Sequence, residues 1–169
     1  MPCSKGNPMP RVSLNQSAPN FTLPDFSGKD FSLSDLKGQK IMLLVFNRTF
    51  AWPFCQRHMA QLRQDHTKFV SRDVAVVVVG PENAREFATY FQKESLPFIG
   101  LPDPKSSVLK LYGQEVNLFK LGRMPAQVLI DKEGIARFVH YGHSMSDIPS
   151  NEEILALVDE INQPKLSRP

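Results

Sequence analysis

The sequence contains very little cysteine, with only Cys3 and Cys55 among its 169 residues. Two cysteines cannot supply the disulfide framework on which small secreted domains depend. The chain also lacks a long apolar run, because its longest ones, IMLLVF and VAVVVV, are far shorter than the roughly 20 residues that cross a bilayer. We therefore expect a protein of a reducing compartment, the cytoplasm, that has no contact with membranes.

The sequence also lacks a large excess of basic over acidic residues, or of acidic over basic ones. The 20 Lys and Arg residues are interspersed with 17 Asp and Glu residues, and the net charge is only +3. This pattern gives no reason to expect nucleic-acid binding. The first residues, MPCSKGNPMPRVSL, include no apolar segment typical of a secretory signal. We expect a flexible arm at residues 1–16, one domain at 17–163 and a frayed tail at 164–169.

Hydrophobic periodicity predicts the early elements of this domain. Residues 21–33 hold two short alternating pieces on either side of a turn at Gly28, which is typical of a β-hairpin. The run at 41–46 and the run at 74–80 are continuously apolar, which indicates strands buried on both faces. Between them, residues 53–70 carry apolar side chains at three- or four-residue steps, so we expect one helix that begins at Pro53.

The second half of the sequence continues the alternation of strands and helices. We expect a helix at 83–94, a short strand and turn at 96–104, a short helix at 105–113, two strands joined by a turn at 127–142, and a last helix that starts with a capping box of Ser150 and Glu153. Such an order fits an α/β fold in which helices cover both faces of a central mixed sheet, with right-handed crossovers between the parallel strands.

One junction between strand and helix, LLVFNRTFAWPFC, is the candidate site. Ligand and catalytic sites of open α/β sheets form at the carboxyl ends of strands, where a helix begins. Cys55 lies in the first helical turn, where unpaired N–H groups and the helix dipole favour a thiolate, and Arg48 and Thr49 lie just upstream. The other interpretation is that Cys55 is a small apolar residue of the core.

The tetrapeptide Trp52-Pro53-Phe54-Cys55 has the spacing of a Cys-x-x-Cys redox turn, with Trp52 in the place of the first cysteine. Two further segments, SAPNFTLPDFSGKDFSLSDLKGQKIMLLVF and RMPAQVLIDKEG, complete a pattern that runs from Ser17 to Asn162. Over this range the chain resembles the peroxiredoxin-like proteins of the alkyl hydroperoxide reductase and thiol-specific antioxidant (AhpC/TSA) family, in the thioredoxin superfamily. The resemblance implies a thioredoxin-like three-layer fold with an N-terminal β-hairpin extension.

The resemblance also implies an activity. Proteins of this kind are thiol-dependent peroxidases, antioxidant oxidoreductases that reduce a hydroperoxide substrate through a cysteine and draw on an external thiol reductant such as thioredoxin. No organic cofactor is implied, and the sequence leaves a homodimer open. Two alternatives remain at this point: a redox-inactive thioredoxin-fold binding module, and a thiol–disulfide oxidoreductase. Stoichiometric oxidation of Cys55 by peroxide would separate an enzyme from a binding module.

Residue roles follow from the same resemblance, and they leave two alignments open. In the first, Trp52 occupies the reactive position and Cys55 the resolving one; in the second, Cys55 itself attacks the peroxide. Arg48 and Thr49 would hold the peroxide oxygens, and Arg123 is a further candidate partner for the developing charge. We also hypothesise that position 52 is cysteine or selenocysteine in relatives or in the gene itself, which the sequence of codon 52 would test.

Other residues would shape the site rather than react. Pro53 and Phe54 complete the turn, and Pro125 matches the place where thioredoxin-like proteins carry a cis-proline. His58, one helical turn after Cys55, is a candidate base or a group that tunes the thiol, against the alternative of a partly buried histidine without catalytic duty. A zinc site made by His58 with His140 and His143 is not expected, because only one thiol is available.

Overall fold

The computed structural model describes residues 12–114, 116–117 and 122–164. Its centre is a five-stranded sheet in the order β5-β4-β3-β8-β9. Strands β3, β4 and β5 run parallel, whereas β8 and β9 are antiparallel to their neighbours, so the predicted mixed sheet is confirmed. The bounds are β3 at Ile41–Phe46, β4 at Val74–Gly80, β5 at Ile99–Pro102, β8 at Ala126–Ile130 and β9 at Ala136–Tyr141.

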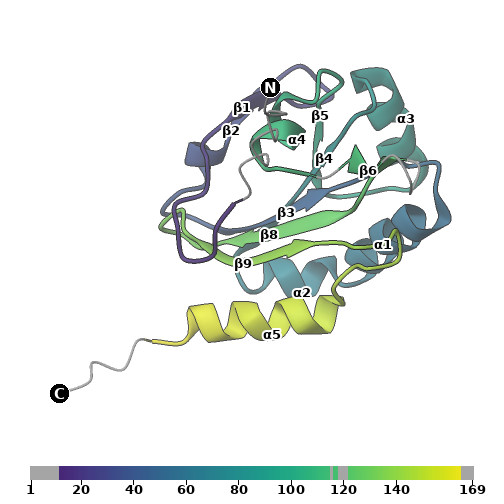
Figure 1. Cartoon of the computed structure of the whole chain (residues 1–169). Coiled ribbons are helices and arrows are strands. Elements are labelled where there is room, and N and C mark those ends of the chain that lie inside the picture. The colour runs from purple at the N-terminus through teal and green to yellow at the C-terminus, as the bar shows by residue number, and fades with distance from the viewer. Residues whose placement is uncertain (1–11, 115, 118–121, 165–169) are drawn as a thin grey trace, which may run out of the picture.

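Helices cover both faces of the sheet, as a three-layer fold requires. One face packs against apolar side chains of α1 (Pro53–Gln64), α2 (His66–Val70), α3 (Ala84–Lys93) and α5 (Asn151–Asn162). The other face packs against α4 (Ser107–Leu111), the 3-10 turn η1 (Leu33–Asp35) and the N-terminal hairpin. In Figure 1, α2 and α5 lie below the sheet, while α4 and the hairpin lie above it. A separate small ladder joins β6 (Val116–Asn117) to β7 (Gly122–Arg123).

The predicted N-terminal hairpin is present as β1 (Thr22–Pro24) and β2 (Asp30–Ser32), with Leu23 opposite Phe31. Its turn depends on Gly28, whose φ of 92° is a conformation that other residues rarely adopt. The carboxylate of Asp25 accepts hydrogen bonds from the N–H groups of Ser27 and Lys29, at 2.8 and 3.0 Å. Local turn chemistry therefore accounts for this element, which is why the sequence was sufficient to predict it.

The sequence places residues 12–16 in the flexible arm, but in the structure these residues run along β9. The N–H of Asn15 donates to the carbonyl of Ala136 at 2.8 Å, and the N–H of Ala136 donates to Gln16. Val12 is buried, and its N–H donates to the hydroxyl of Tyr141 at 3.1 Å. The attachment depends on partners about 120 residues away, so local composition could not indicate it. Residues 1–11, including Cys3, lie outside the described residues, as do residues 165–169 of the expected tail.

One helix was expected over 53–70, and this prediction was wrong in one respect, because Asp65 divides the segment into α1 and α2. The backbone of Asp65 has a ψ of 7°, outside the helical range. The side chain of Asn151, at the start of α5, donates to the carbonyl of Gln61 at 2.9 Å and to the carboxylate of Asp65 at 3.0 Å. A contact from a distant helix therefore accompanies the break, whereas hydrophobic spacing alone continues through it.

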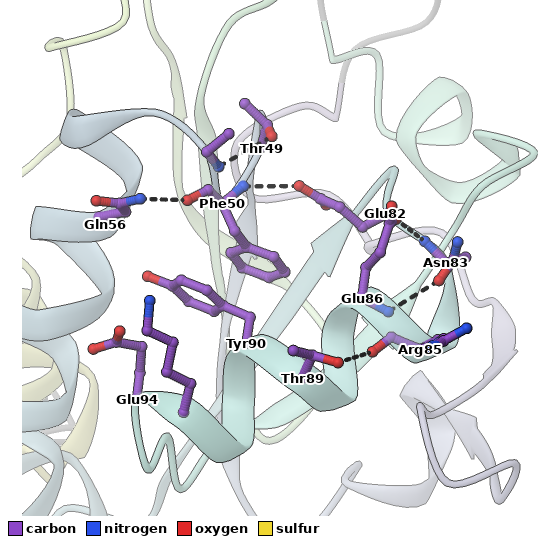
Figure 2. Close-up of a pocket in the computed structure, with 12 residues that line it drawn as sticks. Thr49, Phe50, Gln56, Glu82, Asn83, Arg85, Glu86, Thr89, Tyr90 and Glu94 are labelled. Carbon is purple, nitrogen blue, oxygen red and sulfur yellow. Dashed lines mark hydrogen bonds between the residues drawn. The ribbon is translucent and has the colours of Figure 1, made fainter.

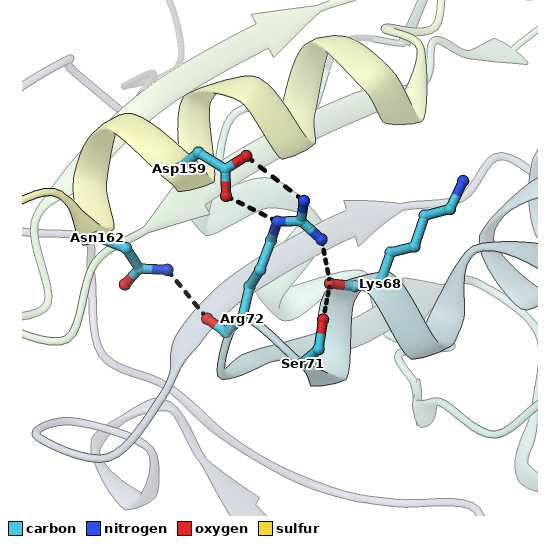
Figure 3. A network of polar contacts seen from close by, with 5 residues as sticks. All are labelled: Lys68, Ser71, Arg72, Asp159 and Asn162. Carbon is cyan, nitrogen blue, oxygen red and sulfur yellow. Dashed lines mark hydrogen bonds and ion pairs between the residues drawn. The ribbon is translucent and has the colours of Figure 1, made fainter.

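Helix α5 is fastened to the end of α2 by a polar network (Figure 3). The guanidinium of Arg72 donates to the carboxylate of Asp159 at 2.7 Å and to the carbonyl of Lys68 at 2.9 Å. Asn162 in turn donates to the carbonyl of Arg72 at 3.2 Å. At its other end α5 is capped by the hydroxyl of Ser150, which accepts from the N–H of Glu153. These contacts hold the last helix against the face of the sheet that carries α1.

No helix within the described ranges has both the length and the apolar character needed to cross a membrane.

Gly142, at the end of β9, makes a close backbone contact next to the candidate site. A Cβ atom there would lie 2.9 Å from the carbonyl oxygen of Asp147 and 3.0 Å from that of Pro125, and neither backbone atom can move away freely. We expect Gly142→Ala to lower the free energy of unfolding by about 1–3 kcal/mol, measured by urea denaturation. Ser144→Ala, an exposed change in the same loop, should stay within about 0.5 kcal/mol of the parent. An equal loss in both variants would contradict this explanation.

Candidate functional site

The candidate site is built where β3 ends and α1 begins. After Phe46 the chain passes through Asn47 and Arg48, which are both buried, and reaches Trp52 in an extended conformation at the N-cap of α1. Pro53 is the first helical residue, as the sequence predicts. No side chain caps this end of the helix. The N–H groups of the first turn therefore have no partner within the helix and remain available to a negative charge, such as a thiolate or an oxyanion.

The loop at 49–51 is held from two sides, as Figure 2 shows. The N–H of Phe50 donates to the Oε1 atom of Glu82 at 2.8 Å, and its carbonyl accepts from the side chain of Gln56 at 2.8 Å. Thr49 also hydrogen-bonds the carboxylate of Glu82, while its hydroxyl accepts from Ala51 N–H at 3.3 Å. Burial raises the pKa of Glu82, against the lowering effect of these hydrogen bonds. The loop that leads into α1 is thus tied to the carboxyl end of β4.

Beside this loop lies an open cleft of about 820 Å³, bounded mainly by α3. Phe50 stacks on the ring of Tyr90, with centroids 4.2 Å apart and planes at 9°, and forms part of the floor of the cleft. Burial raises the pKa of Tyr90 to about 12, so this phenol stays protonated at neutral pH. The lining mixes three carboxylates with two cations, which are Glu82, Glu86, Glu94, Arg85 and Lys93.

Arg48 and Trp52 lie together on the outer side of the turn. The guanidinium carbon of Arg48 is 4.3 Å from the centre of the Trp52 ring, a cation–π contact. Arg48 is buried, Trp52 is half-buried, and Pro53 and Phe54 are exposed beside them. The structure therefore brings Arg48 and Trp52 together at the start of α1. The side chain of Arg123 lies outside the described part of the chain, so its role stays a prediction.

Cys55 is the third residue of α1 and points inward, with 5% of its surface exposed. Its side chain borders a small, partly enclosed cavity of about 10 Å³ that is also lined by His58, Pro125 and Gln127. His58 is buried too, and its Nε2 atom lies 3.0 Å from the amide nitrogen of Gln127. Cys55 is thus buried, and it borders a cavity that polar side chains of α1 and β8 line together with apolar residues.

Burial lowers the pKa of His58 to about 4, so the ring is neutral at physiological pH. A neutral ring with this pKa is a weak proton acceptor near pH 7. The surroundings of His58 therefore argue against general-base catalysis, and tuning of the thiol and a histidine without catalytic duty both stay predictions.

Pro125 lines the same cavity as Cys55, but the expected cis peptide bond is absent: no peptide bond among the described residues is cis. Pro125 instead follows the short β7 segment directly into β8, and its carbonyl accepts from the N–H of Gly142 at 2.8 Å. This cross-strand bond continues the β8–β9 ladder, in which Ala126 is paired with Tyr141. The prediction of a cis bond rested on family resemblance, and local pairing is satisfied here by the trans form.

The loop that follows β9 also lines this cavity, through residues 147–149. The carboxylate of Asp147 contacts the Nε2 atom of His140 at 3.1 Å and accepts from the N–H of His143 at 2.9 Å. The hydrogen bond from His143 is the main reason that the pKa of Asp147 is lowered. Within the described ranges no three His, Cys, Asp or Glu side chains are gathered so that they could hold a metal ion.

Two residues of the site were missed in the sequence, although each left a signal. Gln127 is a polar residue inside the apolar run AQVLI, which was expected to be a buried strand. Glu82 comes two residues after β4, and the carboxyl ends of the adjacent parallel strands β3 and β4 meet at one edge of the sheet. A search for polar residues in buried strands and at neighbouring strand ends would have found both.

The neutral state of His58 makes stability depend on pH. An unfolded histidine, with a pKa near 6.5, takes up a proton as the pH falls, whereas the folded ring does so only at about 4. The contribution of His58 to the free energy of unfolding is therefore fully present above pH 6.5. It falls by roughly 3 kcal/mol as the pH drops to 4. Urea denaturation at both ends of this pH range should show that the free energy of unfolding decreases less in His58→Leu than in the parent. Equal losses would contradict the assignment.

Comparison with known proteins identifies the family. The model of the AhpC/TSA family matches residues 14–139. A putative peroxiredoxin bcp from Coxiella burnetii (strain RSA 493 / Nine Mile phase I) is 30% identical over 129 residues, which are 73% of this chain and 85% of that protein. Chloroplastic peroxiredoxin Q from Oryza sativa subsp. japonica is 30% identical over 132 residues, which are 77% of this chain and 59% of the rice protein. The chain thus spans about three-fifths of the length of such plant relatives.

Solved structures agree on the fold. The crystal structure of peroxidoxin BcpB from Mycobacterium tuberculosis matches with a TM-score of 0.79 at 20% identity, covering 90% of this chain and 100% of that one. A putative thiol:disulfide interchange protein DsbE from Chlorobium tepidum matches with a TM-score of 0.70 at 25% identity, covering 87% of this chain and 99% of the other. The sheet order, the N-terminal hairpin and the family match agree, and the chain belongs to the AhpC/TSA family of peroxiredoxin-like proteins.

Proposed function

We propose that the protein is a thiol-dependent peroxidase in which Cys55 is the redox residue. The observation that carries the proposal is the position of Cys55 in the first turn of an uncapped helix at the carboxyl end of β3. Relatives that share 30% of their residues with this chain are named peroxiredoxins, which supports the same chemistry. Among the described residues Cys55 is the only thiol.

The reaction begins with the Cys55 thiolate and a hydroperoxide. The sulfur attacks the terminal oxygen, an S–O bond forms as the O–O bond breaks, and the leaving alkoxide takes up a proton to become an alcohol, or water in the case of hydrogen peroxide. The product on the protein is a sulfenic acid. A first external thiol condenses with it, releasing water and forming a mixed disulfide, and a second thiol then restores Cys55 and leaves as a disulfide of the reductant.

Three features of the site serve this chemistry. The free N–H groups at the start of α1 stabilise negative charge on the sulfur. The buried positive charge of Arg48, two residues after β3 and against Trp52, favours the thiolate and the departing alkoxide. Glu82 and Gln56 hold the loop at 49–51, so the start of the helix keeps its place while charge develops. Thr49 contributes to the same hold, because its side chain hydrogen-bonds the carboxylate of Glu82.

Trp52 determines which catalytic cycle the protein can follow. Because position 52 carries no thiol, a Cys-x-x-Cys disulfide cannot form within the turn, and turnover must proceed through one cysteine and an external reductant. Trp52 is half-buried at the N-cap, and Cys55 lies behind it with little exposed surface. We therefore propose a slow peroxidase that uses a thioredoxin-type reductant in a reducing compartment such as the cytoplasm.

The test uses a Cys3→Ser background, so that Cys55 is the only thiol. We expect one equivalent of hydrogen peroxide to give a sulfenic acid that a dimedone-type reagent traps on the Cys55 peptide, as seen by mass spectrometry. Peroxide consumption with dithiothreitol, and then with a thioredoxin system, should be lost in Cys55→Ser. Trp52→Cys should raise the rate at least about tenfold, because it places a more exposed thiol at the N-cap.

Each outcome has a distinct meaning. Equal rates for the parent and Trp52→Cys would show that Cys55 carries the reaction alone and that position 52 adds nothing. Turnover by Trp52→Cys without any reaction of Cys55 would make this chain a disabled form of an active enzyme. If neither protein consumes peroxide and Cys55 forms no adduct, the peroxidase proposal fails and a binding module becomes the better interpretation.

A further inference from the structure

The cavity behind Cys55 is separate from the large cleft and much smaller. Its volume of about 10 Å³ is close to the least that one water-sized oxygen needs. The walls come from five parts of the fold, which are the end of β3, α1 with Cys55 and His58, β8 with Gln127, β9 with His140, and the loop before α5 with Asp147. None of the residues that line this cavity lines the cleft beside α3. The cavity and the cleft are therefore lined by different residues, and Cys55 belongs to the lining of the cavity.

Gln127 brings an unsatisfied polar group to this cavity. The residue is 2% exposed, and its Oε1 atom has no hydrogen-bond partner while its Nε2 atom lies 3.0 Å from His58. Rotating the amide by half a turn exchanges its oxygen and nitrogen. Oε1 then bonds to His58, and the NH₂ group is left without a partner. In both orientations one end of a buried amide is left without a partner, which costs folding free energy. A small polar group in the cavity would satisfy it.

We propose that this cavity receives the oxygen of the Cys55 sulfenic acid and that Gln127 is the positioning residue that holds it. The inference rests on the proposed peroxidase function, because peroxide is the source of the oxygen. After the S–O bond has formed and the alcohol has left, rotation about the Cβ–Sγ bond turns the S–OH group inward. There the hydroxyl donates to Oε1 of Gln127. The adjacent His58 ring is neutral, and the carboxylate of Asp147, whose pKa is lowered, lies on the same cavity.

The size of the cavity has a consequence for further oxidation. A second peroxide molecule would convert the sulfenic acid to a sulfinic acid, which carries two oxygens on sulfur and is not reversed by ordinary thiols. The cavity is close in size to one oxygen, so we expect a second oxygen on the same sulfur to lie outside the contact with Gln127. Gln127 should therefore favour arrest at the sulfenic acid stage and leave Cys55 in a form that an external thiol can still reduce.

The chain offers a matched control in Gln114. This glutamine is 1% exposed, it too has an Oε1 atom without a partner, and its amide nitrogen donates to the carbonyl of Met124 at 2.9 Å. It does not line the cavity behind Cys55. Replacing Gln114 by leucine removes a buried amide in the same way as replacing Gln127, but from a side chain that does not line the cavity. The pair therefore separates a local effect on Cys55 from a general loosening of the core.

The experiment measures the oxidation products of Cys55 in the Cys3→Ser background. Intact mass spectrometry after increasing doses of hydrogen peroxide gives the ratio of sulfinic to sulfenic acid, and delayed addition of a dimedone-type reagent gives the lifetime of the sulfenic acid. We expect Gln127→Leu to raise the ratio and shorten the lifetime about five- to tenfold, the effect of losing one hydrogen bond. Gln114→Leu should match the parent. If Gln127→Leu does not fold, the same two measurements are made on Gln127→Met, which keeps the length of the side chain and should show the same changes.

Two results would overturn the inference while leaving the peroxidase intact. The first is a sulfenic acid that forms normally and has the same lifetime and product ratio in the Gln127 variants as in the parent. The second is an equal change in Gln114→Leu, which would reduce the effect to a loss of core packing. If no sulfenic acid forms on Cys55 even in the parent, the proposed function itself fails and the inference fails with it.

Discussion

Strand β3 is hydrogen-bonded along both edges, to parallel β4 and to antiparallel β8, and all six of its side chains are buried. Because of this pairing, three chain segments meet where β3 ends: Phe46 is paired with Val79 of β4 and with Ala126 of β8. Glu82 follows the first partner and Pro125 precedes the second. The position of α1, and with it the surroundings of Cys55, depends on this central pairing more than on any single contact in the turn.

The site has two sides with different physical character. On the outer side, Arg48 and Trp52 stack above the open start of α1, next to a cleft of mixed charge. On the inner side, Cys55 borders a small, partly enclosed cavity in which His58 is neutral and the amide of Gln127 is only partly satisfied. The tryptophan removes the more exposed thiol of a Cys-x-x-Cys turn, so any redox chemistry of the turn moves to the inner side, where access is narrow and oxygen-sized groups fit best.

Much of this arrangement could be predicted from local patterns. The hairpin around Gly28, the buried strands at 41–46 and 74–80, and the start of α1 at Pro53 all follow from turn chemistry and hydrophobic period. The errors have a common cause, which is contact with distant segments. Asn151 meets the backbone where α1 and α2 separate, and residues 12–16 are held by β9. At Pro125, family resemblance suggested a cis bond, yet the ladder to β9 is satisfied with a trans one.

The sequence by itself determined the layered α/β fold, the junction that carries Trp52 and Cys55, and the absence of a second thiol in the turn, because these depend on residue type and short-range spacing. Only the tertiary structure decided which way Cys55 faces and what surrounds it. Gln127 is more than 70 residues from Cys55 in the chain, and Glu82 is 32 residues from Phe50. Such neighbours meet because strands pair across the sheet, and pairing between distant strands leaves no periodic signal at the positions that come together.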